Sequence, residues 1–144
     1  MLYFFHNFFH SARDGTEERF MKIISGTTSK GGHYSPGVLS HGTLYISGQL
    51  PIDPRTGQVA EGGAAEQTRT ALGNMERILL AAGAKKEDVV LCRVYNPDVS
   101  LWDEVNAAYA EFFGAHRPAR VMVPTTALHH GALVEIEAIA ETEE

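Results

Sequence analysis

The chain has 144 residues, enough for one domain with one sizeable core. An apolar fraction of 44% and a charged fraction of 21% are ordinary for a soluble globular protein. The formal net charge of −6 argues against nucleic acid as the main partner, because phosphate binding needs a basic surface.

The first 20 residues have an unusual composition, with five of the seven phenylalanines. They lack the basic start and cleavage site of a secretory signal, and they are too short and too polar to span a bilayer. Met21 then opens MKIISG, a typical start. We predict that residues 1–20 are an extension outside the core, from an upstream start codon or an artefact, and that residues 21–144 form a single domain. The alternative is an amphipathic arm that docks on a neighbouring subunit or on a membrane surface.

Short strands and turns are expected next. Residues 22–26 predict a strand, and residues 27–36, rich in Ser, Thr and Gly, predict a loop. Residues 38–48 predict a hairpin that turns at residues 40–42. The motif PIDPRTG, residues 51–57, predicts a tight surface turn.

The middle of the chain predicts two helices on either side of a strand. Residues 63–82 repeat apolar side chains at helical spacing and end before Gly83, which suits a helix C-terminus. Residues 88–95, with VVLCRVY at the centre, give the strongest strand signal. A second helix begins near residues 97–100 and ends at Gly114.

Two closing strands, about residues 119–127 and 132–140, complete an α+β domain with one sheet. The predicted order is three strands, a helix, a strand, a helix and two strands. Both helices should pack on one face, because a sheet of this size needs one apolar cover. Residues 88–95 and 132–140 carry apolar side chains on both faces, so we expect another subunit to bury the second face.

Charged residues interrupt both closing strands. A guanidinium such as that of Arg120 grips a carboxylate with two parallel hydrogen bonds and stays charged at any working pH. Arg120 therefore either pairs with an acidic residue at the surface or lines a site for an anion. Met122 lies on the same side by alternation, and we interpret it as packing. Glu135 and Glu137 share one face, which is either the polar side of the strand or the place where a carboxylate positions water.

Three further residues are candidates. Tyr34 either closes over a ligand or caps the edge of the core. Ser47, before Gly48, offers a hydroxyl and an open backbone N–H to an anion, without the His–Asp partners that a serine nucleophile needs. Asn106 lies either on a solvated face of the second helix or at a site.

The cysteine and histidine content favours no metal or redox chemistry. Cys92 is the single cysteine, which excludes an intrachain disulfide and fits a reducing compartment. Its place inside VVLCRVY favours a buried thiol over a nucleophile. Adjacent His129 and His130 would point to opposite faces of a strand, a poor metal pair unless a loop re-aims them.

Four stretches resemble the YjgF/YER057c/UK114 family, also called Rid, the enamine/imine deaminases. They are YISGQLPIDPRTGQV, NMERILLAAGAKKEDVV, VNAAYAEFF and PARVMVPTTALHHGALVEIEAIA. The resemblance spans about residues 22–140. Its most specific pattern is P-A-R followed by an apolar strand, a loop and V-E-I-E. It implies a chorismate-mutase-like α+β fold with a mixed, mostly antiparallel sheet. It also implies a homotrimer with clefts between subunits, and no cofactor or metal. We expect a cytoplasmic protein without a nucleic-acid or membrane partner.

The activity that the resemblance implies is hydrolysis of 2-aminoacrylate and other 2-imino acids to 2-keto acids and ammonia. Arg120 would hold the substrate carboxylate, and Glu135 would position the attacking water. The other matching positions, implied as substrate-binding, are Tyr34, Ser47, Gly48 and Asn106. Met122 departs from the family, which often has a cysteine there, so backbone groups would replace the thiol.

Two other functions fit the same residues. A regulatory protein would bind a small carboxylate at Arg120 without turning it over. An endoribonuclease, an activity assigned to family members, is disfavoured by the acidic balance of the chain.

Overall fold

The computed structural model describes residues 21–25 and 32–143, so the predicted extension, residues 1–20, lies outside this range. Within it, strands and α-helices follow the predicted order. They are β1 (Met21–Ile24), β2 (Gly37–Ser40), β3 (Thr43–Gln49), α1 (Ala64–Ala81), β4 (Val89–Asn96), α2 (Trp102–Phe113), β5 (Ala119–Pro124) and β6 (Glu135–Glu141).

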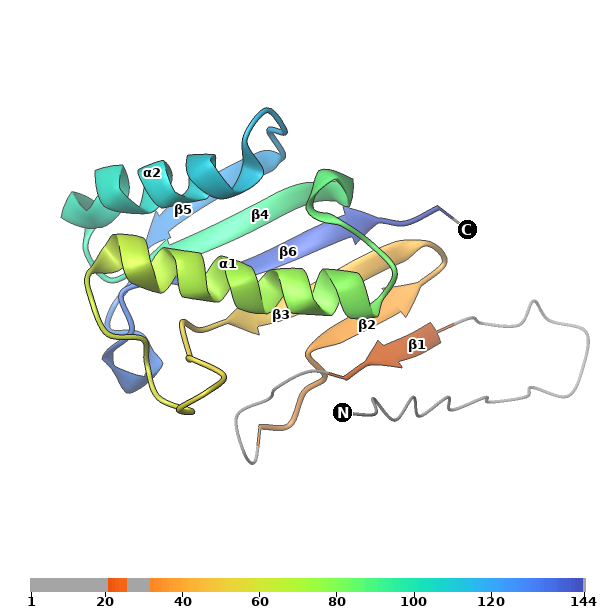
Figure 1. Ribbon diagram of the computed structural model, residues 1–144, viewed down its shortest axis with the longest axis horizontal. Coiled ribbons are helices and arrows are strands. Elements are labelled where there is room, and N and C mark those ends of the chain that lie inside the picture. Colours follow the sequence, from red (N-terminus) through yellow and green to blue (C-terminus); the bar gives the residue numbers. More distant parts are fainter. Residues whose placement is uncertain (1–20, 26–31, 144) are drawn as a thin grey trace, which may run out of the picture.

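The strands form one mixed sheet in the order β1-β2-β3-β6-β4-β5. Only β4 and β5 pair in parallel among the pairs of this sheet in the described chain, and α2 connects them. Both helices cross the same face, α1 over the centre and α2 over the β4–β5 end (Figure 1). The α+β fold, the mostly antiparallel sheet and the single helical layer are therefore confirmed.

Two predicted turns have clear local causes. The β2–β3 hairpin turns at His41 and Gly42, whose φ angles of 49° and 77° suit the right-handed twist of a two-residue hairpin. Helix α1 ends because Gly83, one residue beyond the cap Ala82, takes a φ of 80° that other residues rarely adopt.

The core fills the space between the sheet and the helices. Three α1 side chains, Leu72, Met75 and Leu79, are fully buried there. The strands contribute side chains of alternating residues, which is how β-strands line one face. The fully buried strand and helix α2 members include Leu44, Val94, Val105 and Ile136.

The closing strands are shorter than predicted. Strand β5 ends at Pro124, and β6 begins at Glu135 rather than at residue 132. The backbone N–H of Leu133 donates instead to Oε1 of Gln67 on α1, at 2.8 Å. Leu133, which alternation alone assigns to the strand, therefore makes a tertiary hydrogen bond to α1 instead.

The face opposite the helices is open in a single chain. By strand register, Ile23, Tyr45 and Val121 all point to it, and they are 45%, 51% and 44% exposed. Singly exposed apolar residues are normal, but several on one sheet face indicate a contact surface. The predicted burial of this face by another subunit stays a prediction.

Neither α-helix in the described chain combines the length and the apolar composition that crossing a bilayer requires.

Substitution of two neighbouring leucines of α1 tests which face of the helix packs against the core. Leu79 is fully buried and Leu80 is 63% exposed. Leu79→Ala should lower the free energy of unfolding by about 2–5 kcal/mol, because it leaves a cavity. Leu80→Ala should change it by less than about 0.5 kcal/mol. Denaturant unfolding of both variants at one protein concentration measures the difference, and equal effects would contradict the helix orientation.

Candidate active site

The start of α2 is fixed by the segment that follows β4. The side chain of Asp98 accepts a hydrogen bond from the N–H of Ser100 at 2.8 Å, and Nδ2 of Asn96 donates to the Asp98 carbonyl at 3.1 Å. Asp98 caps a single 3-10 turn, Val99–Leu101, that leads directly into α2. Trp102 therefore becomes the first residue of α2, at a defined place beside β5.

Arg120 faces this helix. In the parallel register Arg120 lies opposite Cys92, a fully buried core residue, so both side chains are on the helix-covered face. Nη1 of Arg120 donates to Oδ1 of Asn106 at 2.9 Å. Its guanidinium carbon lies 4.7 Å from the ring centroid of Tyr109 and 5.7 Å from that of Trp102. Asn106 thus lies against Arg120 rather than on a solvated face.

The charge of Arg120 has aromatic neighbours and no acidic partner. Every salt bridge in the described chain is made by another cation, Arg55, Arg69 or Arg93. Cation–π contacts contribute about 0.5–1 kcal/mol at exposed sites and about 2 kcal/mol at desolvated sites. Removing a charge from water costs several kcal/mol, so these contacts alone do not offset the desolvation of the guanidinium. The predicted role of the guanidinium as a site for an external anion agrees with this arrangement and stays a prediction.

Cys92 and Tyr109 lie beneath the guanidinium. Burial raises the pKa of the Cys92 thiol to about 11, against smaller opposing effects of the Tyr109 hydroxyl and of Arg120. Burial, followed by the neighbouring Cys92, raises the pKa of Tyr109 as well. The buried Tyr109 hydroxyl has no hydrogen-bond partner within residues 21–25 and 32–143. Cys92 is thus a neutral, buried thiol, as the sequence favours.

A second group of predicted site residues gathers where β3 meets β6. A Cβ built on Gly48 would overlap Oε1 of Glu135, so the absence of a side chain at Gly48 makes room for this carboxylate. Ser47 holds the early loop, because its Oγ donates to the Ser35 carbonyl at 2.6 Å and its N–H donates to the Pro36 carbonyl at 3.0 Å. Tyr34, 48% exposed, precedes this anchored segment directly.

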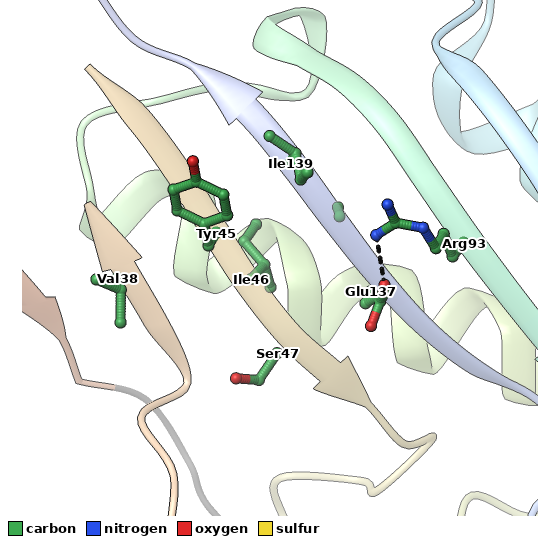
Figure 2. Close-up of a pocket in the computed structure, with 8 residues that line it drawn as sticks. Val38, Tyr45, Ile46, Ser47, Arg93, Glu137 and Ile139 are labelled. Carbon is green, nitrogen blue, oxygen red and sulfur yellow. Dashed lines mark hydrogen bonds and ion pairs between the residues drawn. The ribbon is translucent and has the colours of Figure 1, made fainter. Parts of the chain in front are cut away.

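The two glutamates of β6 share a face, as predicted, but have different partners. Glu137 pairs with Nη1 of Arg93 at 2.6 Å, seen as the dashed line in Figure 2. Glu135 has no such cation within hydrogen-bonding distance in the described chain. Burial, and then the Glu137 carboxylate, raise the pKa of Glu135 above its usual value, while His129 opposes the shift. Of the two carboxylates, Glu135 is therefore the one without a salt bridge in the described chain.

The Arg93–Glu137 pair lies beside a shallow pocket of about 220 Å³ on the open face (Figure 2). Val38, Tyr45, Ser47 and Ile139 also line it. This volume is below the roughly 300–1,000 Å³ of typical ligand pockets. The pocket is a depression within the open apolar face rather than a preformed ligand site.

The seven predicted site residues form two groups on opposite faces of the sheet. Ile136, a core residue, separates Glu135 from Glu137 by alternation, which places both carboxylates on the open face. Arg120 lies on the helix-covered face, and Met122 lies with it, packed against the core as predicted. We call Arg120, Met122 and Asn106 the edge-strand group. The open-face group is Ser47, Gly48 and Glu135, and we count with it Tyr34, which is in the loop that Ser47 anchors.

The histidine pair lies in a single turn of 3-10 helix, His129–Gly131, where a φ of 58° at His130 re-aims the side chains. The two rings are in contact, tilted at 53° to each other with centroids 3.8 Å apart. The described residues contain no group of three or more ligands that could hold a metal ion.

Sequence reasoning missed the aromatic neighbours of Arg120. Trp102, Asn106 and Tyr109 are spaced i, i+4, i+7 on α2, so they form one stripe. The helical spacing can be read from the sequence. Arg120, which these side chains contact, lies on β5, and the sequence alone does not show that β5 lies beside this face of the helix. The Arg93 partner of Glu137 was missed for the same reason.

Comparison with known proteins defines the class. Residues 27–142 match the model of the family described as Endoribonuclease L-PSP. The chain is 44% identical over 112 residues to the RutC family protein PH0854 of Pyrococcus horikoshii, covering 78% of this chain and 89% of that protein. Human 2-iminobutanoate/2-iminopropanoate deaminase is 41% identical over 121 residues, which cover 83% and 88% of the two chains.

The fold points to the same class. The crystal structure of YyfA from Yersinia pestis, a conserved Rid family protein of unknown function, superimposes with a TM-score of 0.80 at 37% identity. The match covers 85% of this chain and 100% of that one. The chain therefore belongs to the Endoribonuclease L-PSP family, the YjgF/Rid family that the sequence motifs indicated.

The raised pKa of Glu135 predicts a pH-dependent stability. A carboxyl whose pKa is higher in the folded chain gives a contribution that is present below the unfolded pKa and lost as pH rises through the folded one. Glu135→Gln removes the charged form. The variant should therefore melt above the parent protein at about pH 8 and together with it at about pH 4.

Thermal unfolding followed between these pH values measures the effect. Glu61→Gln, on the exposed loop before α1, is the matched control and should follow the parent protein throughout. A Glu135→Gln variant that loses stability at high pH would show that the carboxylate has a cationic partner.

Proposed function

We propose that the protein hydrolyses small 2-imino acids, and the enamines that interconvert with them, to 2-keto acids and ammonia. The observation that carries this proposal is the half-buried guanidinium of Arg120, with no acidic partner in the described chain. A guanidinium has five N–H donors, and only one hydrogen bond, to Asn106, uses them here. A substrate carboxylate fits the remaining fork. Relatives named as imine deaminases support this chemistry.

The complete site forms between two copies of the chain. In one copy Arg120 and Glu135 are on opposite faces of the sheet, so neither can serve a substrate held by the other. In a closed ring, the edge-strand group of one copy meets the open-face group of the next. We propose a homotrimer of this kind, as the family resemblance implies. The exposed Ile23, Tyr45 and Val121 supply apolar area for the contact.

The reaction needs water as its only co-reactant. Arg120 holds the carboxylate, which places the protonated imine carbon near Glu135 of the neighbouring copy. As the oxygen of water bonds to this carbon, Glu135 takes a proton and the C=N electron pair moves to nitrogen. Glu135 returns the proton to nitrogen, the C–N bond breaks, and the hydroxyl proton passes to the carboxylate as the C=O bond forms. Ammonia then removes that proton. Acid–base help of this kind contributes about 10²–10⁴-fold.

The environment of Glu135 suits both halves of this cycle. A carboxyl of ordinary pKa accepts protons poorly near neutral pH, and the best proton carriers have pKa values close to the working pH. Burial raises the pKa of Glu135 in that direction. Gly48 supplies the space that lets the carboxylate adopt its position.

The arginine fork is tested by removing it. Arg120→Ala should lower kcat/KM for 2-iminobutanoate on the order of 100-fold, because truncating one partner of a desolvated charge pair costs several kcal/mol. Imines generated by an amino-acid oxidase, with ammonia release as the readout, provide the assay. Arg117→Ala, three residues earlier on an exposed loop, is the control and should retain activity.

An unchanged rate in Arg120→Ala would remove the deaminase proposal. Saturable binding of a 2-keto acid with no ammonia release from any imine would identify a carboxylate-binding protein instead.

The shared cleft is tested by mixing two inactive variants. Arg120→Ala and Glu135→Gln each damage a different group, so a mixed oligomer contains clefts with an intact group from each copy. In a trimer ring that contains both variants, one of the three clefts receives both intact groups, so the mixed species should restore about a third of the parent activity. Co-expression with two affinity tags yields the mixed species. Absence of any recovery in it would place both residues in one copy's site.

A further inference from the structure

The stripe of α2 formed by Trp102, Asn106 and Tyr109 surrounds the guanidinium of Arg120. We propose that Trp102 and Tyr109 are positioning residues that hold this guanidinium for the substrate carboxylate. We further propose that the exposed ring of Trp102 forms one wall of the carboxylate site. The inference rests on the proposed function, because it assigns a role within the same site.

The distances place the guanidinium close to both rings. Trp102 and Tyr109 are seven residues apart, a rise of about 10 Å along a helix. The guanidinium carbon lies 5.7 Å from the first ring centroid and 4.7 Å from the second. Two rings that are about two turns apart on α2 therefore both lie within cation–π distance of the guanidinium.

Asn106 supplies the third constraint. It lies between the two aromatic residues on the stripe, and its Oδ1 accepts from Nη1 of Arg120 at 2.9 Å. Two rings limit how far the guanidinium can move along the helix, and the hydrogen bond limits how it rotates. An arginine side chain otherwise loses considerable rotamer freedom when it binds. Ordering it before the ligand arrives lowers that cost and improves affinity.

Tyr109 is itself held in place. Its side chain is 6% exposed, and its ring packs against that of Phe113 with centroids 4.7 Å apart. Among the described residues its hydroxyl makes no well-formed hydrogen bond, and the neighbouring Cys92 thiol is only a weak partner, so the hydroxyl does not explain the position. The aromatic ring of Tyr109 is therefore the part that positions Arg120, and a phenylalanine at this position should do the same.

Trp102 has an additional role, as a wall of the carboxylate site, because its side chain is accessible. It is 42% exposed at the first turn of α2, beside a cation that lacks an anionic partner. A carboxylate that reaches Arg120 must therefore pass close to the indole ring. Trp102 is also the single tryptophan of the chain, so its fluorescence reports on this place alone.

Binding of 2-oxobutanoate, the stable product of 2-iminobutanoate hydrolysis, provides the first test. Calorimetry should give a Kd about tenfold weaker for Trp102→Leu and for Tyr109→Leu than for the parent protein. The conservative variants Trp102→Phe and Tyr109→Phe keep a ring and should bind within about twofold of the parent. Saturation with 2-oxobutanoate should also change the Trp102 fluorescence of the parent protein and of Tyr109→Phe.

Nitrogen-15 NMR of the arginine side chains provides a second test without ligand. In the parent protein the Nε–H of Arg120 should show a ring-current shift, and Arg120→Lys identifies the resonance. Both leucine variants should move it toward the position of an exposed arginine, while the phenylalanine variants should not. A purely structural role of the rings would not produce this pattern of loss and rescue.

The outcomes separate the two proposals. A parent protein that does not bind 2-oxobutanoate removes the proposed function, and this inference with it. A parent protein that binds, together with a Trp102→Leu variant that binds equally well, overturns the inference and leaves the function standing. Trp102 is partly exposed, so this variant should fold even if Tyr109→Leu does not.

Discussion

The parallel pairing of β4 with β5 decides where the charge of the site lies. Arg120 is opposite Cys92, a core residue, so its side chain points into the layer between sheet and helix. Helix α2 crosses that layer because it joins the two parallel strands (Figure 1). A slip of one residue would turn Val121 inward and send the cation to the other face. The site therefore depends on this register more than on any single contact.

The sheet then divides the remaining groups. Its open face has Glu135 over Gly48, and its covered face has Arg120 under α2. The open face combines exposed apolar side chains with one ion pair, Arg93–Glu137. Because the two faces of one sheet hold different groups, a single chain contains both Arg120 and Glu135 without bringing them together.

Local patterns predicted most of the fold. Helical spacing, the glycine after α1 and the hairpin turn are each properties of a few consecutive residues, so sequence reasoning placed them well. The ends of the closing strands were wrong because Leu133 bonds to Gln67, 66 residues away in the sequence. Alternation grouped Glu135 with Glu137 and Met122 with Arg120, as the structure has them. The faces that these pairs occupy depend on which strands are neighbours, which alternation cannot give. The aromatic residues around Arg120 were hidden for the same reason.

The buried thiol of Cys92 has a consequence for the chemistry of the whole chain. Peroxides and disulfides react with thiolates, and a pKa of about 11 leaves almost none of this group ionised at neutral pH. No other cysteine is present in the sequence. Peroxides and disulfides should therefore react slowly with Cys92, and thiol oxidation should modify this protein far less than proteins that depend on an exposed thiolate.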